Sequence, residues 1–284
     1  MDPLIWQGDP PTLDEPVILA SFDGWTDAGA AGSATASALR AQLETTRLAE
    51  VDPDRIYDYR DRRPTLSINR GVLGEPDWPS LVVDHLRSDS GRDLVMIHGG
   101  EPDFGWRWLS AAFAQLAHDL GATQYVGLGS VPGPVPHTRP VRVISTSSDE
   151  TMLERFGRSQ ERVVVPASFQ VVLESALRDA GIQTLGLWAR IPHYVGGEYP
   201  EAAIALSERL KELIGVELET TAMQLEASQQ RTRLDEAAEG SAEVSEHIGN
   251  LETWFDADAP DPTIPTGEEI AAEFEQFLRD RPES

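Results

Sequence analysis

Residues 17–43 read VILASFDGWTDAGAAGSATASALRAQL, and they indicate the class of fold to which the chain belongs. The first six residues form an apolar run of the length that is typical of a buried strand. The run stops at the polar residues 23–27, after which alanine and other small residues continue over the length of a helix. The stretch therefore predicts a strand, a polar turn and a helix over residues 28–43.

The same succession of strands and helices continues along the chain. Strands are predicted at residues 94–97, 124–128 and 184–191, and helices at residues 106–120, 169–180 and 200–214. Strands that alternate with helices of this length indicate a mostly parallel sheet that is covered by helices on both faces. We therefore expect residues 1–216 to form one α/β domain.

An antiparallel inset is predicted within this domain at residues 46–97. Residues 55–59 and 66–69 look like antiparallel strands, and a hairpin is predicted over residues 81–97 because the turn sequence SDSG separates two apolar runs. Residues 129–140 contain four prolines, so we expect a stiff loop that holds polar side chains in place.

The composition changes after residue 216. Residues 217–284 contain 18 acidic and 4 basic residues, which is a net charge of −14 out of a total of −25. Apolar residues at helical spacing on either side of Gly240 predict two helices, which form an acidic arm over residues 217–255. Residues 256–284 are predicted to form a Pro-rich linker and a short C-terminal helix that docks back onto the domain.

The overall composition excludes several classes of protein. A net charge of −25 repels phosphate backbones and anionic lipids, so binding to nucleic acid or to a membrane surface is disfavoured. The chain has no cysteine, which removes disulfides, thiolate metal sites and cysteine nucleophiles. No apolar run approaches the roughly 20 residues that span a bilayer, and no leader-like segment opens the chain. We expect a soluble, cytoplasmic protein.

Polar side chains gather directly after the predicted parallel strands. In open α/β sheets, ligands bind outside the carboxyl ends of the strands. We therefore expect one shared cleft whose carboxylates, imidazoles and arginine do acid–base work or hold an anion. The candidate cleft residues are Asp23, Asp27, His98, Glu101, His137, Arg139 and His193. The alternative is that these residues cap helices and satisfy turns, a role that suits Asp27 at the start of its helix.

Several well-known catalytic motifs are missing from the sequence. It contains neither a Gly-x-x-x-x-Gly-Lys-[Ser/Thr] loop nor a Gly-x-Gly-x-x-Gly turn after a strand, and its single lysine, Lys211, lies in a predicted helix. Ser21, Ser130 and Ser145 lack the Gly-x-Ser-x-Gly elbow of hydrolases. The histidines lack the close spacing of a helical zinc motif, so we predict no metal site and no cofactor.

Aromatic side chains supply candidate contacts with a partner protein. Trp25 lies in the first polar turn, and Trp106 and Trp108 lie at the start of a predicted helix. Phe274 and Phe277 share one face of the predicted C-terminal helix. We expect these side chains either to pack in the core or to form a contact with another subunit or partner.

Four segments together resemble the actinobacterial branch of the proteasome assembly chaperone 2 family. They are residues 17–29 (VILASFDGWTDAG), 98–108 (HGGEPDFGWRW), 127–139 (GLGSVPGPVPHTR) and 192–200 (PHYVGGEYP). The resemblance implies a three-layer α/β/α sandwich similar to that of nucleoside phosphorylases and related hydrolases. It also implies a homo-oligomer, with a trimer expected, and a non-catalytic role like that of the eukaryotic relatives, which help to assemble the proteasome core particle.

Two functions remain open at this point. The first is a protein-binding assembly factor that resembles proteasome assembly chaperones, with copies of itself, proteasome subunits or another protein as partners. The second is an enzyme or small-ligand binder of the nucleoside phosphorylase or hydrolase type, which requires the cleft candidates to converge in one concave pocket. A further possibility is that the acidic arm only closes the oligomer.

Overall fold

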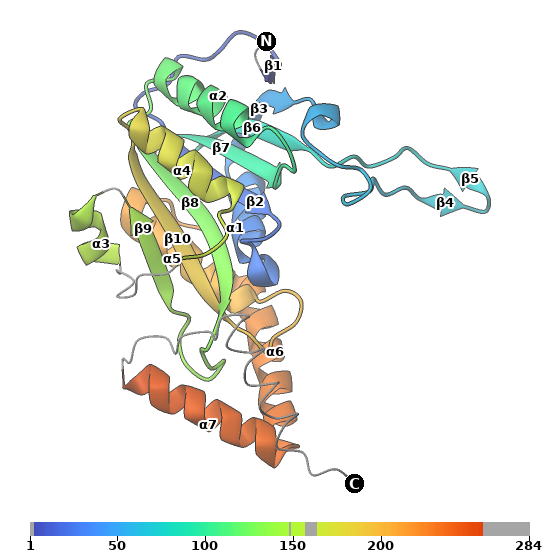
Figure 1. Cartoon of the computed structure of the whole chain (residues 1–284), viewed down its shortest axis with the longest axis vertical. Helices are drawn as coiled ribbons and strands as arrows, with labels where there is room; N and C mark the ends of the chain where they lie inside the picture. The colour runs from blue at the N-terminus through green and yellow to red at the C-terminus, as the bar shows by residue number, and fades with distance from the viewer. Residues whose placement is uncertain (1–2, 148, 157–163, 258–284) are drawn as a thin grey trace, which may run out of the picture.

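The computed structural model describes residues 3–147, 149–156 and 164–257, and one large sheet forms its centre (Figure 1). The strands of this sheet are β1 (Leu4–Trp6), β2 (Val17–Asp23), β3 (Glu44–Val51), β6 (Leu81–Arg87), β7 (Asp93–Gly100), β8 (Gln124–Gly133), β9 (Val143–Ser147) and β10 (Gln183–Pro192). Their order across the sheet is β1-β3-β6-β7-β2-β8-β10-β9. The adjacent strands β7, β2, β8 and β10 are parallel, and β3 points in the same direction. This confirms the predicted α/β class with a mostly parallel sheet and an antiparallel inset.

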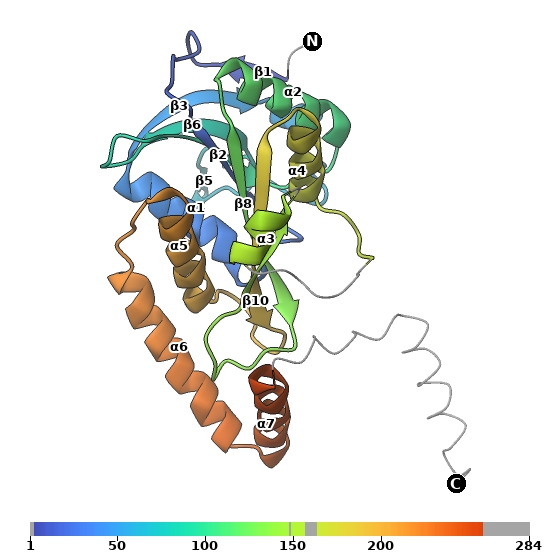
Figure 2. The same ribbon diagram turned by 90° about the vertical axis from the view of Figure 1, so that its left-hand side faces the viewer.

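Helices cover both faces of the sheet (Figures 1 and 2). They are α1 (Ala31–Gln42), α2 (Trp106–Asp119), α4 (Phe169–Asp179) and α5 (Pro200–Ile214), and the short α3 (Glu150–Phe156) follows β9. Helices α2 and α4 pack on the face that carries Ile18 and Phe22, whereas α1 and α5 pack on the face that carries Val17 and Leu19. Both faces of β2 are therefore buried. This explains why its sequence is an unbroken apolar run, whereas a half-exposed strand would alternate apolar and polar residues.

The first strand, turn and helix fold as predicted, but the helix begins later than expected. Ala28–Ala30 form a 3-10 turn, η1, in which Gly29 has a φ of 64° and Ala30 a φ of 53°. Left-handed backbone cannot continue into a right-handed helix, so α1 begins at Ala31. Glycine is also required at position 29 for space, because a Cβ there would lie 2.8 Å from the Cβ of Tyr199.

The inset contains the predicted hairpin but lacks the predicted strand at residues 55–59. Strands β6 and β7 pair in antiparallel fashion, which confirms the hairpin over residues 81–97. Arg55 instead ends a 3-10 turn, η2 (Pro53–Arg55), and residues 56–59 form no strand, so this prediction was wrong. Ile56 and Tyr57 lie directly after this turn and are buried in the core without strand pairing.

A small hairpin projects from the body of the molecule (Figure 1). Its strands β4 (Ile68–Asn69) and β5 (Val72–Leu73) form a separate two-stranded sheet. At its base, the backbone N–H groups of Thr65 and Asp77 donate to each other's carbonyl oxygens at 3.1 and 2.6 Å. The strand predicted at residues 66–69 is therefore only two residues long.

The predicted loop at residues 129–140 begins as part of a strand. Strand β8 continues to Gly133 and pairs with β10 along its whole length, whereas β2 pairs with β8 only as far as Gly127. No β2 residue therefore pairs with Pro132. Proline has no backbone N–H, and this is tolerated where no neighbouring strand needs it as a donor. We call residues 128–133 of β8 and their partners on β10 the overhang.

The acidic arm lies at the far end of the overhang (Figures 1 and 2). Its helices α6 (Thr221–Glu239) and α7 (Ala242–Asp256) stand on either side of Gly240, as predicted. Helix α6 has no fully buried residue, and α7 buries Ile248 and Leu251. The domain boundaries remain predictions, and the predicted C-terminal helix lies outside the described residues. Within the described ranges, no helix is long and apolar enough to cross a bilayer.

Candidate functional site

The seven cleft candidates fall into two groups. Asp23 and His98 line one cavity at the ends of β2 and β7, whereas His137 lines a separate cavity beside the arm. Strand length explains the separation: β2 ends at Asp23 opposite Gly100 of β7, but β8 and β10 continue through the overhang before the chain reaches His137 and His193. The single cleft that we expected is therefore divided into two.

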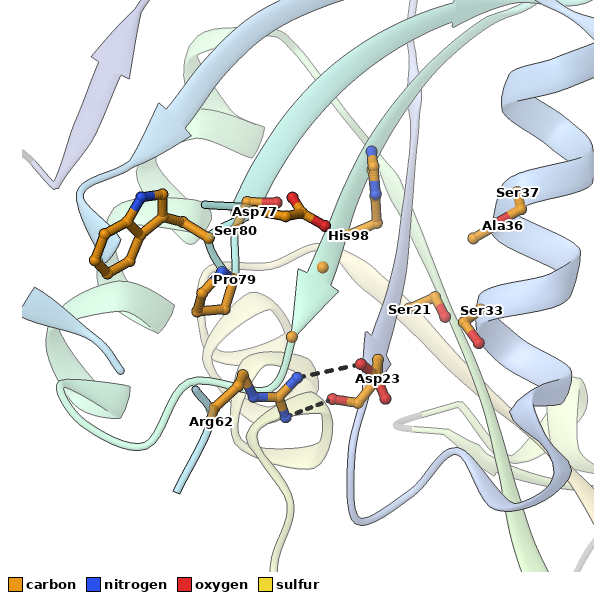
Figure 3. Close-up of a pocket in the computed structure, with 13 residues that line it drawn as sticks. Ser21, Asp23, Ser33, Ala36, Ser37, Arg62, Asp77, Pro79, Ser80 and His98 are labelled. Atoms are coloured by element: carbon orange, nitrogen blue, oxygen red, sulfur yellow. Dashed lines mark hydrogen bonds and ion pairs between the residues drawn. The ribbon is translucent and has the colours of Figure 1, made fainter. Parts of the chain in front are cut away.

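The first cavity has a volume of about 280 Å³ and lies between β7, β2, α1 and the chain that leads to and from the projecting hairpin (Figure 3). Its lining combines hydroxyls, carboxylates, an imidazole and a guanidinium. The polar side chains that line it are Ser21, Asp23, Ser33, Ser37, Arg62, Asp77, Ser80 and His98. The cavity thus offers both hydrogen-bond donors and acceptors on all sides.

A buried carboxylate holds the imidazole of His98 in place. Nε2 of His98 lies 2.8 Å from Oδ2 of Asp84, a residue that is 1% exposed. The same carboxylate accepts hydrogen bonds from Arg40, at 3.0 Å, and from Arg47. Burial acts to raise the pKa of Asp84, but hydrogen bonds and charges from His98 and Arg47 outweigh it and lower the pKa to about 2. Because Asp84 is an anion that only accepts, Nε2 of His98 is the ring nitrogen that donates to it.

Asp23 and Glu101 have different partners at this end of the sheet. Arg62 donates from Nη1 to Oδ2 of Asp23 at 3.2 Å and from Nη2 to the Asp23 carbonyl oxygen at 3.1 Å (Figure 3). Glu101 instead accepts from the backbone N–H groups of Phe169, at 2.6 Å, and Trp25, at 3.3 Å. Glu101 therefore ties the start of α4 and the turn after β2 to the end of β7, and it does not line the first cavity.

Asp27 serves the start of α1. Its Oδ1 accepts from the backbone N–H groups of Gly32, at 2.8 Å, and Ser33, at 3.3 Å. Burial raises the pKa of Asp27 although these hydrogen bonds oppose the change. The carboxylate satisfies N–H groups that have no partner inside the helix, which matches the structural alternative for this residue.

The second group joins the chain beyond the overhang to the arm. His137 is 1% exposed, and its Nδ1 lies 2.7 Å from Oη of Tyr194 while its Nε2 lies 3.1 Å from Oδ1 of Asp235 on α6. Nε2 of His193 lies 3.3 Å from Nε2 of His247 on α7. Both ring nitrogens of His137 thus make hydrogen bonds within the chain, which leaves neither for a ligand.

Arg139 is also engaged by the arm. It donates from Nε and Nη2 to the two carboxylate oxygens of Asp256 at 2.8 and 2.6 Å, and from Nη1 to Oε1 of Glu252 at 3.0 Å. This forked arrangement is the strong form of an arginine–carboxylate pair. The arginine that we expected to hold an external anion is therefore bound to carboxylates of its own chain.

The aromatic candidates have different environments. Trp106 donates from Nε1 to the carbonyl oxygen of Pro102 at 2.6 Å, and it packs against the core as Trp108 does. Trp108 also lies under the guanidinium of Arg55, 4.6 Å from the ring centre. Trp25 is 69% exposed and is open to a partner. Phe274 and Phe277 lie outside the described residues.

The serines that the sequence singled out differ in their hydrogen bonding. Oγ of Ser21 makes no hydrogen bond within the described residues. Ser130 and Ser145 donate to the carbonyl oxygens of Ala28, at 2.6 Å, and Phe156, at 3.1 Å. Within the same ranges, no three histidine, aspartate or glutamate side chains are grouped to hold a metal ion.

Sequence reasoning missed the residues that hold the candidates in place. Around the first cavity these are Asp84 and Arg62, and beside the arm they are Tyr194, Asp235, His247, Glu252 and Asp256. Asp84 did leave a signal, because it is a charged residue inside the otherwise apolar first half of LVVDHLR at residues 81–87. The arm residues left none, since acidic side chains are common throughout that region.

Comparison with known proteins agrees with this fold. The PAC2 family matches residues 21–238. A crystal structure of the Mycobacterium tuberculosis unknown function protein Rv2714 is 30% identical with a TM-score of 0.83, and the match covers 98% of this chain and 92% of that one. The PAC2 family protein from Streptomyces avermitilis is 33% identical with a TM-score of 0.74, over 82% of this chain and 99% of that one.

A third structure is similar over most of the chain. It is the Mycobacterium tuberculosis proteasome-assembly chaperone homologue Rv2125, which is 31% identical with a TM-score of 0.76, over 82% of this chain and 99% of that one. No curated protein matches the chain. The extent of the family match and the identity to these structures show that the chain belongs to the PAC2 family.

Proposed function

We propose that this protein is a non-catalytic assembly factor that binds other proteins and acts in the cytoplasm as an oligomer of itself, with a trimer as the expected state. Membership of the PAC2 family supports the proposal, as does 31% identity to a protein described as a proteasome-assembly chaperone homologue. Proteasome subunits are therefore the first candidate partners.

The observation that carries the proposal is the projecting hairpin, which we define as residues 65–77. Its apolar side chains Leu66, Ile68, Val72 and Leu73 are between 47% and 70% exposed. A two-stranded hairpin by itself is at best marginally stable in water, and a contiguous exposed apolar patch is typical of a protein contact. Contact with another protein surface would bury these side chains and stabilise the hairpin.

The charge around the hairpin supports contact with a second copy of this chain. Residues 60–77 contain four arginines and three acidic residues, in a chain whose net charge is −25. Two copies of so acidic a protein repel each other over most of their surface. In the hairpin region this repulsion is weak, and exposed apolar area is available there.

A double substitution in the hairpin tests this proposal. Ile68→Ser with Val72→Ser should lower the mass in solution to that of the monomer and abolish capture of purified proteasome subunits, because both apolar contacts are removed. Light scattering behind a sizing column measures the mass, and a pull-down measures the capture. The unfolding midpoint should stay unchanged, since both side chains are exposed.

Leu225→Ser is the matched control, because Leu225 is an apolar side chain on α6 that is 61% exposed. This variant should keep the mass and the capture of the unchanged protein. If the hairpin variant also keeps both, the hairpin is not the contact and the proposal loses its support.

A further inference from the structure

A protein-binding role does not account for a buried hydroxyl at the first cavity. Ser21 is 2% exposed, and its Oγ has no hydrogen-bond partner in the described part of the chain. Its side chain turns toward Ser33 of α1, and both residues line the cavity (Figure 3). A hydroxyl that is taken out of water without a new partner is unfavourable, and in folded proteins it usually meets a ligand or an ordered water molecule.

His98 supplies a second polar atom to the same cavity. Its Nε2–H donates to Asp84, so Nδ1 is the ring nitrogen that is left to meet a ligand, and it makes no hydrogen bond within the described residues. Ser21 on β2 and His98 on β7 are partners in the parallel ladder, which places both side chains on the same face of the sheet. Two polar atoms that have no partner within the described residues therefore lie on neighbouring strands.

The charges of the cavity argue against an anion as its ligand. Asp23 and Asp77 line the cavity, and the guanidinium of Arg62 is already paired with Asp23. Arg40 and Arg47 both donate to the buried Asp84. An anion in the cavity would therefore lie near carboxylates of its own charge, while the nearby guanidinium groups are already paired with carboxylates of the protein.

The mixed lining favours a ligand whose groups both donate and accept, and sugar hydroxyls do so. Carboxylates, serine hydroxyls and the imidazole nitrogen complement a ring that carries several hydroxyl groups. Trp78 also lines the cavity and is 49% exposed, and its ring lies edge-on to that of Tyr59.

We propose that this cavity binds a small neutral sugar or cyclic polyol, with ligand hydroxyls bonded to Oγ of Ser21 and Nδ1 of His98. The cavity volume of about 280 Å³ is at the lower limit of small-molecule sites, roughly 300–1,000 Å³, and therefore suits a single ring. The proposal adds a ligand to the assembly factor and does not depend on its protein partners.

Calorimetric titration of the full-length protein with D-ribose, D-glucose and myo-inositol tests the proposal. At least one of these probes should bind saturably with a Kd below about 10 mM. Ser21→Ala should weaken that binding by about fivefold, because one hydrogen bond to the ligand is lost. The same variant should not lower the unfolding midpoint, since its hydroxyl bonds to no described protein group.

Ser110→Ala is the matched control. Ser110 is a buried serine on α2, on the other face of the sheet, and its Oγ donates to the carbonyl oxygen of Arg107 at 3.3 Å. This variant should lower the unfolding midpoint and leave sugar binding unchanged. Three results would each overturn the proposal: no probe saturates, Ser21→Ala binds as tightly as the unchanged protein, or inorganic phosphate binds where the sugars do not.

Discussion

Two of the histidine–aspartate pairs in the described residues, His98–Asp84 and His137–Asp235, have opposite patterns of burial. At the first cavity, the side chain of Asp84 is 1% exposed and that of His98 is 13% exposed. Beside the arm, the side chain of His137 is 1% exposed and that of Asp235 is 47% exposed. In the first pair a buried acid orients a base that faces a cavity, whereas in the second a buried base holds an acid on a surface helix. The same two residue types thus serve a site in one place and packing in the other.

Removal of the acid from each pair should show the largest difference. Asp84→Ala leaves His98 and two arginines without their buried carboxylate, and we expect it to lower the free energy of unfolding by about 3–5 kcal/mol. Asp235→Ala breaks a half-exposed pair and should cost about 1 kcal/mol or less. Urea denaturation measures both values. Equal losses would show that burial does not distinguish the pairs.

Removal of the histidine from each pair should instead affect the arm more in the pair that lies beside it. His137→Ala deletes two side-chain contacts of a buried imidazole and should cost about 1–3 kcal/mol, with faster amide hydrogen exchange in α6. His98→Ala should leave exchange in α6 at its original rate, because His98 contacts the sheet and not the arm. Exchange read by mass spectrometry separates the two. Faster exchange in α6 with both variants would mean that the two pairs are coupled.

Acid should weaken the first pair more than the arm. The folded-state pKa of Asp84 is about 2, below the roughly 3.9 of an unfolded aspartate, so its stabilisation is present above pH 4 and is lost as the pH falls toward 2. The stability difference between the unchanged protein and Asp84→Asn should therefore shrink by about 2 kcal/mol over this range. Arg139 also lowers the pKa of Asp256, but this pair lies at the surface. The stability difference between the unchanged protein and Asp256→Asn should therefore change less over the same pH range. A pH series of urea denaturation curves compares them, and an equal shrinkage would contradict the assignment of Asp84 as the buried anchor.

Salt should have the smallest effect, and it should be confined to the arm. The pairs of Arg139 with Asp256 and Glu252 are partly exposed and are weakened by counterions, whereas Asp84 is shielded from solvent. Addition of sodium chloride should therefore speed hydrogen exchange in α7 slightly and leave exchange in β6 unchanged. A change in β6 without one in α7 would contradict this distinction.

Much of the fold could be predicted because local patterns and tertiary environment agree in the parallel strands. The apolar run at residues 17–22 is buried on both faces of the sheet, so its sequence and its surroundings carry the same information. At residues 55–59 the local pattern and the surroundings disagree. Ile56 and Tyr57 are buried in the core after a turn, although the composition of this segment is that of a strand. The strand conformation of Pro132 depends on where β2 ends, and only the assembled sheet determines that.

The candidate site was predictable by residue type but not by grouping. His98 and Asp23 do line a cavity, because each lies near the end of a parallel strand. His137 and His193 follow parallel strands as well, yet the overhang moves them to the arm. The role of Asp84 was hidden because its partners come from positions 40, 47 and 98, and no local pattern reports such a meeting.

The length of the overhang sets the distance between the first cavity and the arm, and that length can change only in steps of two residues. A strand rises about 3.3 Å per residue and its side chains alternate in direction, so two residues added to both β8 and β10 would extend the ladder by about 7 Å with every inner side chain still facing inward. A single added residue would turn those faces over. The reach of the arm can therefore lengthen or shorten during evolution in two-residue steps, while the sheet that carries His98 and Asp84 is left as it is.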